Sequence, residues 1–252
     1  FGQFRQRSVE GVSVVHTVES GRGGKSVPCH AWAPNTRVVA APSPTCGADT
    51  NRLGRGRPPR RMARFLISDH HFGHANIIEY CDRPFSSVGE MDTTLLNRHY
   101  ETVDADDLLV HLGDVAMDMS TGEDTIAYFG QLDGDLLVRG NHDVGLDPED
   151  APFPVVDHCT LSHDGYDFYC THRPADVPES WDGWVLHGHH HNNDTDTYPF
   201  VAHDDGRVNV SSELLNFRPL RLSALTELLD ACPDGSRFRD VDAASEYLDR
   251  RE

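Results

Sequence analysis

Lysine is almost absent from this chain. Lys25 is the only lysine among 252 residues, and 41 Asp and Glu residues face 22 Lys and Arg residues, which gives a formal net charge of −19. An acidic, lysine-poor composition favours a cytoplasm of very high salt, because molar salt shortens the Debye length to about 3 Å and screens the self-repulsion of the chain. The alternative is an acidic mesophilic surface. We expect a protein adapted to high salt.

Long apolar runs and paired cysteines are missing as well. No run of about 18 apolar residues exists, which predicts that no segment spans a membrane. The N-terminal residues show no charged stretch followed by an apolar one, so we expect no secretory signal and a cytoplasmic location. The six cysteines form no CxxC pair, which argues against a zinc ribbon and favours reduced thiols over a disulfide framework.

The charge is divided unevenly at about residue 61. Residues 1–61 hold ten Lys and Arg against three Asp and Glu, and they are rich in Gly, Pro and Arg, so we predict a disordered basic extension. Its "GRGGKS" is not a phosphate-binding P-loop, because Glu19 stands where that motif needs glycine. The segment could be a nucleic-acid arm. We favour an upstream extension from a misplaced start, because Met62 directly precedes the first strand-like run.

Residues 62–252 show a different pattern, in which short apolar runs alternate with longer stretches of helical periodicity. This alternation predicts one α/β domain. The runs expected to form buried strands are 63–68, 107–112, 135–140, 166–171 and 184–188, with a later strand at 207–212. The stretches expected to form helices are 89–103 and 122–131, with two more near 220–230 and 241–250.

Each of the five buried strands is followed by polar residues of a few kinds. These are Asp69-His70-His71, Gly113-Asp114, Asn141-His142-Asp143, His172 and His187-Gly188-His189-His190-His191. Because α/β proteins build their sites in loops at the carboxyl ends of strands, we expect these residues to converge. Carboxylate, amide and imidazole ligands suit manganese, iron, zinc or nickel rather than calcium. They are too many for one tetrahedral ion, so we predict a pair of ions that holds the attacking and leaving oxygens of a phosphoryl displacement.

Each residue taken singly has another interpretation. Asp114 after a glycine could be a turn residue, and Asn141 could be a helix N-cap. His172 could be a surface histidine or a buried one with its hydrogen bonds satisfied. Only the joint pattern favours a metal centre.

The ordered motifs "DHH", "GD", "GNHD", a lone histidine and "GHHH" resemble those of the calcineurin-like metallophosphoesterases, which read DxH, GD, GNH(D/E), H and GHxH. The match runs over about residues 65–192, and "VNVSSELLNFRPL" (208–220) continues it. "ISDHHFGHANIIEYCDRPF" is similar to a compact branch found in bacteria, archaea and phages. The resemblance implies an α/β fold in which two central β-sheets are flanked by helices.

The resemblance also implies roles for individual residues. The expected ligands of the first ion are Asp69, His71 and His191, those of the second are Asn141, His172 and His189, and Asp114 bridges the two. His142 would stabilise the transition state and protonate the leaving oxygen, with Asp143 orienting it. His190 is expected to point away from the centre. The expected substrate contacts are His74 and Arg173, with Arg83, Arg98 and Arg139 as further candidates.

The reaction implied is hydrolysis of a phosphate ester by a metal-bridging hydroxide, with manganese as the expected ion and iron, zinc or nickel as alternatives. A phosphodiester is favoured over a monoester, because the chain has little room for a cap domain. The acidic body disfavours an extended nucleic-acid groove and favours a small substrate. The alternative is a non-catalytic metal-binding or metal-regulated interaction protein on the same fold. The sequence leaves the oligomeric state open.

Overall fold

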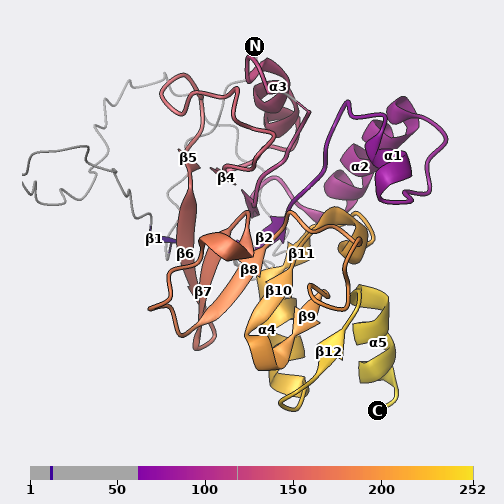
Figure 1. Ribbon diagram of the computed structural model, residues 1–252, viewed down its shortest axis with the longest axis vertical. Coiled ribbons are helices and arrows are strands. Elements are labelled where there is room, and N and C mark those ends of the chain that lie inside the picture. The colour runs from indigo at the N-terminus through magenta and orange to yellow at the C-terminus, as the bar shows by residue number, and fades with distance from the viewer. Residues whose placement is uncertain (1–11, 14–61, 118, 252) are drawn as a thin grey trace, which may run out of the picture. The chain divides into compact units, whose positions relative to one another are not determined.

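The computed structural model describes residues 12–13, 62–117 and 119–251 (Figure 1). The disorder and the misplaced start expected for residues 1–61 therefore lie outside the described residues, apart from the two-residue strand β1 (Val12–Ser13). Within the described ranges, no helix has both the length and the apolar sequence needed to cross a membrane.

One sheet has five strands in the order β11-β2-β3-β4-β5. Its strands are β2 (Arg64–Ile67), β3 (Leu108–His111), β4 (Leu136–Val138), β5 (Val155–Val156) and β11 (Leu220–Arg221). Strands β2 to β5 are parallel, and β11 pairs with β2 in the antiparallel sense. Almost every side chain of β2, β3 and β4 is buried, as expected of parallel strands covered on both faces.

The other sheet has seven strands in the order β1-β6-β7-β8-β10-β9-β12. Beyond β1, its strands are β6 (His158–His163), β7 (Tyr166–Thr171), β8 (Trp184–His187), β9 (Val201–Ala202), β10 (Arg207–Asn209) and β12 (Arg237–Phe238). Strand β8 lies between β7 and β10 and is parallel to both, whereas the remaining pairs are antiparallel.

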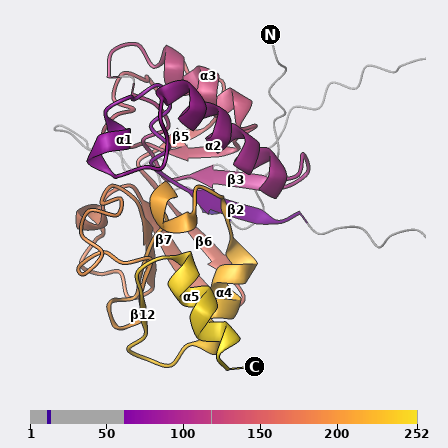
Figure 2. The same cartoon turned by 90° about the vertical axis from the view of Figure 1, so that its right-hand side faces the viewer.

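Five α-helices accompany the sheets in the described residues: α1 (Ile77–Tyr80), α2 (Val88–Thr102), α3 (Glu123–Gln131), α4 (Leu222–Ala231) and α5 (Val241–Asp249). Figure 2 shows α2 and α3 beside the five-stranded sheet, with α4 and α5 in the other half of the molecule. Helix α2 begins where the Ser87 hydroxyl accepts the N–H of Glu90, and it buries Met91, Leu95 and His99 at helical spacing.

The two sheets are joined next to the carboxyl ends of β2 and β10. The Ser68 N–H donates to the Val210 carbonyl at 3.0 Å, and the Ser212 N–H donates to the Ser68 carbonyl at 3.1 Å. These hydrogen bonds bring the ends of parallel strands from both sheets to one region. All the strands and helices predicted from the sequence are present and differ only at their ends, and the expected class, two β-sheets flanked by helices, is confirmed.

Candidate metal centre

Five of the seven expected metal ligands have left-handed backbone. Ten described non-glycine residues have positive φ, and among them are Asp69 (59°), His71 (54°), Asp114 (57°), His189 (73°) and His191 (49°). Such conformations cost on the order of 1 kcal/mol or more each and persist only where the surroundings impose them. The concentration of left-handed residues at the strand ends indicates that the fold fixes the orientation of these side chains.

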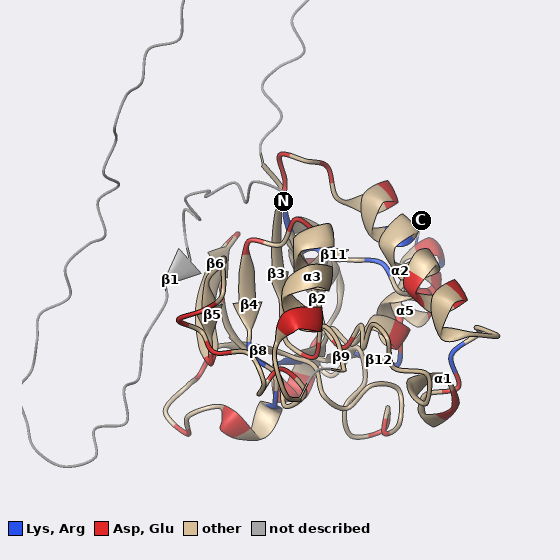
Figure 3. Cartoon of the chain, turned by 90° about the horizontal axis from the view of Figure 1, so that it is seen from above, with Lys and Arg blue, Asp and Glu red and all other residues tan. Residues whose placement is uncertain are grey.

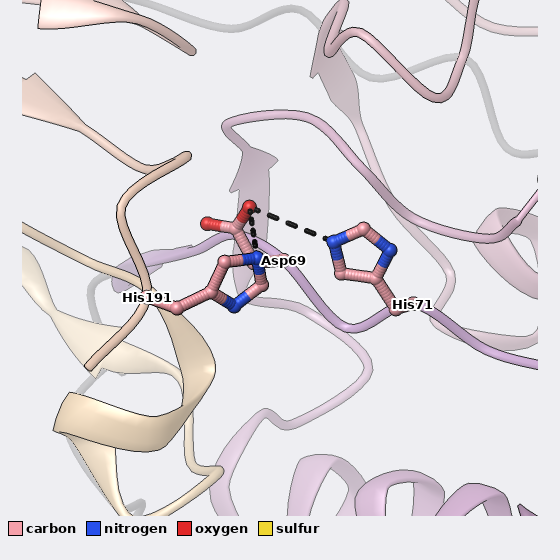
Figure 4. A group of neighbouring side chains, drawn as sticks. All are labelled: Asp69, His71 and His191. Carbon is pink, nitrogen blue, oxygen red and sulfur yellow. Dashed lines mark ion pairs between the residues drawn. The ribbon is translucent and has the colours of Figure 1, made fainter. Parts of the chain in front are cut away.

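Asp69 lies between two imidazoles (Figure 4). Its Oδ1 is 3.9 Å from Nε2 of His71 and 3.7 Å from Nε2 of His191. Its Oδ2 accepts hydrogen bonds from the hydroxyls of Ser68 at 2.6 Å and Ser211 at 2.9 Å. One carboxylate oxygen is therefore fixed by hydroxyl donors, and the other is directed at the two histidines.

Asp114 occupies the middle of the centre. Its Oδ1 accepts the backbone N–H of His142 at 2.8 Å. Its Oδ2 faces three imidazole Nε2 atoms, at 3.4 Å for His71, 3.4 Å for His172 and 3.9 Å for His142. The carboxylate is thus shared between histidines from both sheets.

His172 reaches the centre from the end of β7. Its Nδ1 lies 2.8 Å from the Leu112 carbonyl, so Nδ1 carries the proton of that hydrogen bond and Nε2 is presented to the centre. Nε2 lies 3.1 Å from Oδ1 of Asn141. Burial lowers the pKa of His172, but the hydrogen bond and charge of Asp114 outweigh burial and raise that pKa to about 9.

His191 is held from behind by a buried ion pair. Its Nδ1 is 3.0 Å from Oε1 of Glu213, which also accepts from Nη2 and Nε of Arg83 at 2.7 and 2.9 Å. The Arg83 guanidinium further donates to the carbonyls of Asp69 and His70, each at 2.7 Å. Burial raises the pKa of Glu213, but Arg83 and then His191 outweigh it and lower that pKa to about 2.

This ion pair corrects one expectation and adds a residue. Because the Arg83 side chain is 0% exposed, it cannot contact substrate as the sequence suggested. Arg98, another candidate substrate contact, makes its contacts within the protein: it donates to the Asn216 carbonyl and lies over the ring of Phe217. Glu213 was not predicted, and its only sequence signal was its place in the family-like segment 208–220.

The histidines after β8 point in different directions. The half-buried His189 ring packs against that of His172 with 5.2 Å between centroids, but no set of three potential ligand atoms in the described residues includes it. His190 stacks on Tyr198 with 3.5 Å between ring centroids, and so it points away from the centre as expected. The other predicted ligands do come together: Asp69, His71, Asp114, Asn141, His172 and His191.

His142 lies at the edge of the centre. Its side chain is 25% exposed, and its ring centroid is 5.0 Å from that of His71 and 6.4 Å from that of His74. His74, an expected substrate contact, therefore borders the same site.

Asp143 differs from expectation. Its buried carboxylate accepts the backbone N–H groups of Asp114 at 2.7 Å, Gly140 at 2.9 Å and Val115 at 3.2 Å, and the Thr125 hydroxyl at 3.3 Å. Nδ1 of His142 has no hydrogen-bond partner in the described residues. The expected orienting contact to His142 is therefore replaced by a structural one, in which Asp143 ties the loops after β3 and β4 together.

Two motif glycines permit the close approach of these loops. A Cβ on Gly140 would collide with the backbone nitrogen and carboxylate of Asp114, and one on Gly188 would collide with the side chains of Ser68 and Asp69. Any larger residue at either position would displace a carboxylate from the centre.

The donor set fits divalent metal ions. The carboxylate oxygens and imidazole nitrogens around Asp69 and Asp114 lie 3.4 to 3.9 Å apart. This spacing is close to that of a tetrahedral metal site, in which ligand atoms at about 2.1 Å from the ion are roughly 3.4 Å from each other. Both ring nitrogens of the buried His71 lack a hydrogen-bond partner in the described part of the chain. Four sets of three side chains in the described residues could each hold an ion. Three of them include Asp69 or Asp114, namely Asp69–His71–His191, His71–Asp114–His142 and Asp69–Asp114–His172, and the fourth is Cys81–His191–Glu213.

Fold and site together define an α/β protein of two sheets with a buried carboxylate and histidine centre that could hold metal ions. No family model matches the chain. It is 37% identical over 168 residues to the uncharacterized protein MJ1445 of Methanocaldococcus jannaschii, a match that covers 66% of this chain and 90% of the archaeal protein. The chain belongs to the family of that protein.

One solved structure has a similar fold, and another matches more weakly. A protein of unknown function from Aquifex aeolicus, AQ665, matches with a TM-score of 0.50 at 22% identity, over 67% of this chain and all of that chain. YfcE, a phosphoesterase from E. coli, matches with a TM-score of 0.34 at 17% identity, over 60% of this chain and 78% of that chain.

Proposed function

We propose that this protein is a dinuclear metal-dependent phosphoesterase. The observation that carries the proposal is the Asp114 carboxylate, whose Oδ2 faces imidazoles from both sheets, as a carboxylate shared by two ions would. Asp69, His71 and His191 would hold the first ion, and Asn141, His172 and His189 the second. Bound ions would lower the pKa of a water and neutralise charge that develops on the phosphoryl oxygens.

The remaining residues would act on the substrate directly. The partly exposed His142 would hydrogen-bond a phosphoryl oxygen and donate a proton to the leaving oxygen. His74 and Arg173 would contact the substrate beside it. A small phosphodiester is favoured, because the described residues from Met62 onward form one compact unit without a second domain to close over the centre.

The test is hydrolysis of a diester and the corresponding monoester by the full chain. The protein is stripped of metal with a chelator, reloaded with manganese, and assayed in molar potassium chloride against bis(p-nitrophenyl) phosphate and p-nitrophenyl phosphate. We expect turnover that requires manganese and is faster for the diester. Two bound ions without turnover of either ester would favour the non-catalytic metal-binding alternative.

The role of His142 is tested in the same assay. His142→Ala should retain both ions and lose roughly 10²-fold or more in turnover, as is typical of a removed general acid. The matched control is His163→Ala at the start of the β6–β7 turn, at the opposite end of β7 from His172, which should leave turnover unchanged. Loss of an ion from His142→Ala would make His142 a ligand, as its position beside His71 and Asp114 also permits.

A further inference from the structure

A cavity of about 230 Å³ lies beside the metal centre. Its lining includes Arg139, Asn141, Val144, His172, Arg173 and Asp176, the last in the short 3-10 helix η1 (Pro174–Asp176). Since Asn141 and His172 are proposed metal ligands, the cavity borders the place where the ester phosphorus would bind. A group attached to that phosphorus could enter it.

Two arginines enter this cavity from strand ends of different sheets. Arg139 directly follows β4 and precedes Asn141 by two residues, and Arg173 directly follows His172 at the end of β7. The strand positions of both arginines are fixed by the same ladders that position the ligands. The cavity is therefore lined by one arginine from a strand end of each sheet.

Both guanidinium groups have hydrogen-bond donors to spare. Arg173 is exposed, and its side chain makes no hydrogen bond or ion pair with any residue the structure describes. Arg139 is paired with Asp157 through Nη2 at 2.6 Å, and its Nε and Nη1 have no acceptor among the described residues. The one acidic side chain of the lining is Asp176.

These cations stand out against an acidic molecule. The chain has a net charge of −19, and Figure 3 shows acidic residues on the helices and loops with few basic ones between them. Arg139 pairs with Asp157, and several arginines elsewhere are paired with carboxylates as well, for example Arg83 with Glu213 and Arg237 with Asp205, whereas Arg173 lines the cavity without a carboxylate partner among the described residues. A cavity with two arginines beside a phosphate-ester centre is therefore suited to an anion.

We propose that this cavity binds a second phosphate group of the substrate. The proposal rests on the phosphoesterase function proposed above and narrows its substrate class to phosphate esters that carry another phosphate a few bonds from the ester phosphorus. A guanidinium offers a planar fork of N–H donors that matches phosphate oxygens in pairs. The exposed Val144 side chain provides an apolar wall for the atoms between the two phosphates.

The test compares two probes that differ only in the second phosphate. Binding of thymidine 5′-monophosphate and thymidine 3′,5′-bisphosphate to the manganese-loaded full chain is measured by calorimetry at one ionic strength. We expect the bisphosphate to bind about tenfold more tightly, the size of effect that a charge-assisted hydrogen bond gives. Arg173→Gln and Arg139→Gln should each reduce this ratio, Arg173→Gln to about twofold or less.

The control variant is Arg221→Gln. Arg221 is exposed and pairs with Phe65 near the start of β2, at the opposite end of that strand from Asp69, so the ratio should stay at the wild-type value. Equal affinity of the wild type for both probes, no binding of either probe, or an unchanged ratio in Arg173→Gln would overturn the proposal.

Turnover of bis(p-nitrophenyl) phosphate by the same preparations separates this proposal from the proposed function. One outcome is that the wild type prefers the bisphosphate, Arg173→Gln removes that preference, and the wild type shows no turnover. This outcome would support the anion-binding cavity and reject the phosphoesterase function. Turnover together with equal affinity for the two probes would retain the phosphoesterase and reject the cavity.

Discussion

Removal of the Glu213 charge should destabilise the protein strongly. In Glu213→Gln the Arg83 guanidinium, 0% exposed, loses the counter-ion that is itself only 4% exposed. Removing one partner of a buried pair costs about 3 to 5 kcal/mol, because the other charge stays buried. Glutamine keeps an acceptor oxygen, and Arg83 keeps the carbonyls of Asp69 and His70, so we expect the lower end, about 3 kcal/mol.

The assay is urea unfolding of the metal-free protein in constant potassium chloride. The matched control is Glu101→Gln, which breaks the pair with Arg218 whose side chains are 60% and 46% exposed, and which should cost less than about 1 kcal/mol. Glu213→Gln should also weaken manganese binding by roughly tenfold or more, because it removes the carboxylate behind His191. A loss of stability no larger than that of Glu101→Gln, with manganese affinity unchanged, would refute the reasoning.

Three further predictions concern single side chains and salt. His190→Ala should keep the metal content of the wild type and lose about 1 kcal/mol of stacking on Tyr198, whereas His191→Ala should lower the metal content; equal metal loss, measured by mass spectrometry, would contradict the assignment. Burial lowers the pKa of His99 from the ordinary histidine value of 6.5 to about 4, so the unfolded state takes up a proton first as pH falls. Stability should be full above pH 6.5 and fall by roughly 3 kcal/mol towards pH 4; His99→Leu should flatten this dependence, and an unchanged slope would sink the idea. We also propose adaptation to high salt, for which the unfolding midpoint should rise between dilute and molar potassium chloride, and a constant midpoint would rule it out.

The parts of the fold that the sequence predicted are those with a repeated local signal. Strands β2 and β3 are continuous apolar runs because both of their faces are buried, and α2 shows a helical period. Strands β9 and β12 have two residues each, too few for any period, and they exist only because neighbouring strands pair with them.

Some residues of the candidate site could likewise be predicted from the sequence, and others could not. The metal ligands were predictable because each follows a recognisable strand, and because the order of the motifs indicated that they converge on one site. The Arg83–Glu213 pair joins residues 130 positions apart, and no local pattern connects them. The family resemblance implies that Asp143 orients His142, but the Asp143 carboxylate accepts the N–H groups of Asp114 and Gly140 instead.

We propose that a pair of metal ions would bind on either side of the Asp114 carboxylate. Anomalous X-ray diffraction at the manganese edge, from crystals of the full chain grown with manganese, measures the ions and their ligands directly. We predict two peaks that both contact Asp114, one beside His71 and His191 and the other beside Asn141 and His172. A single peak, or ions that leave Asp114 without a contact, would contradict the account.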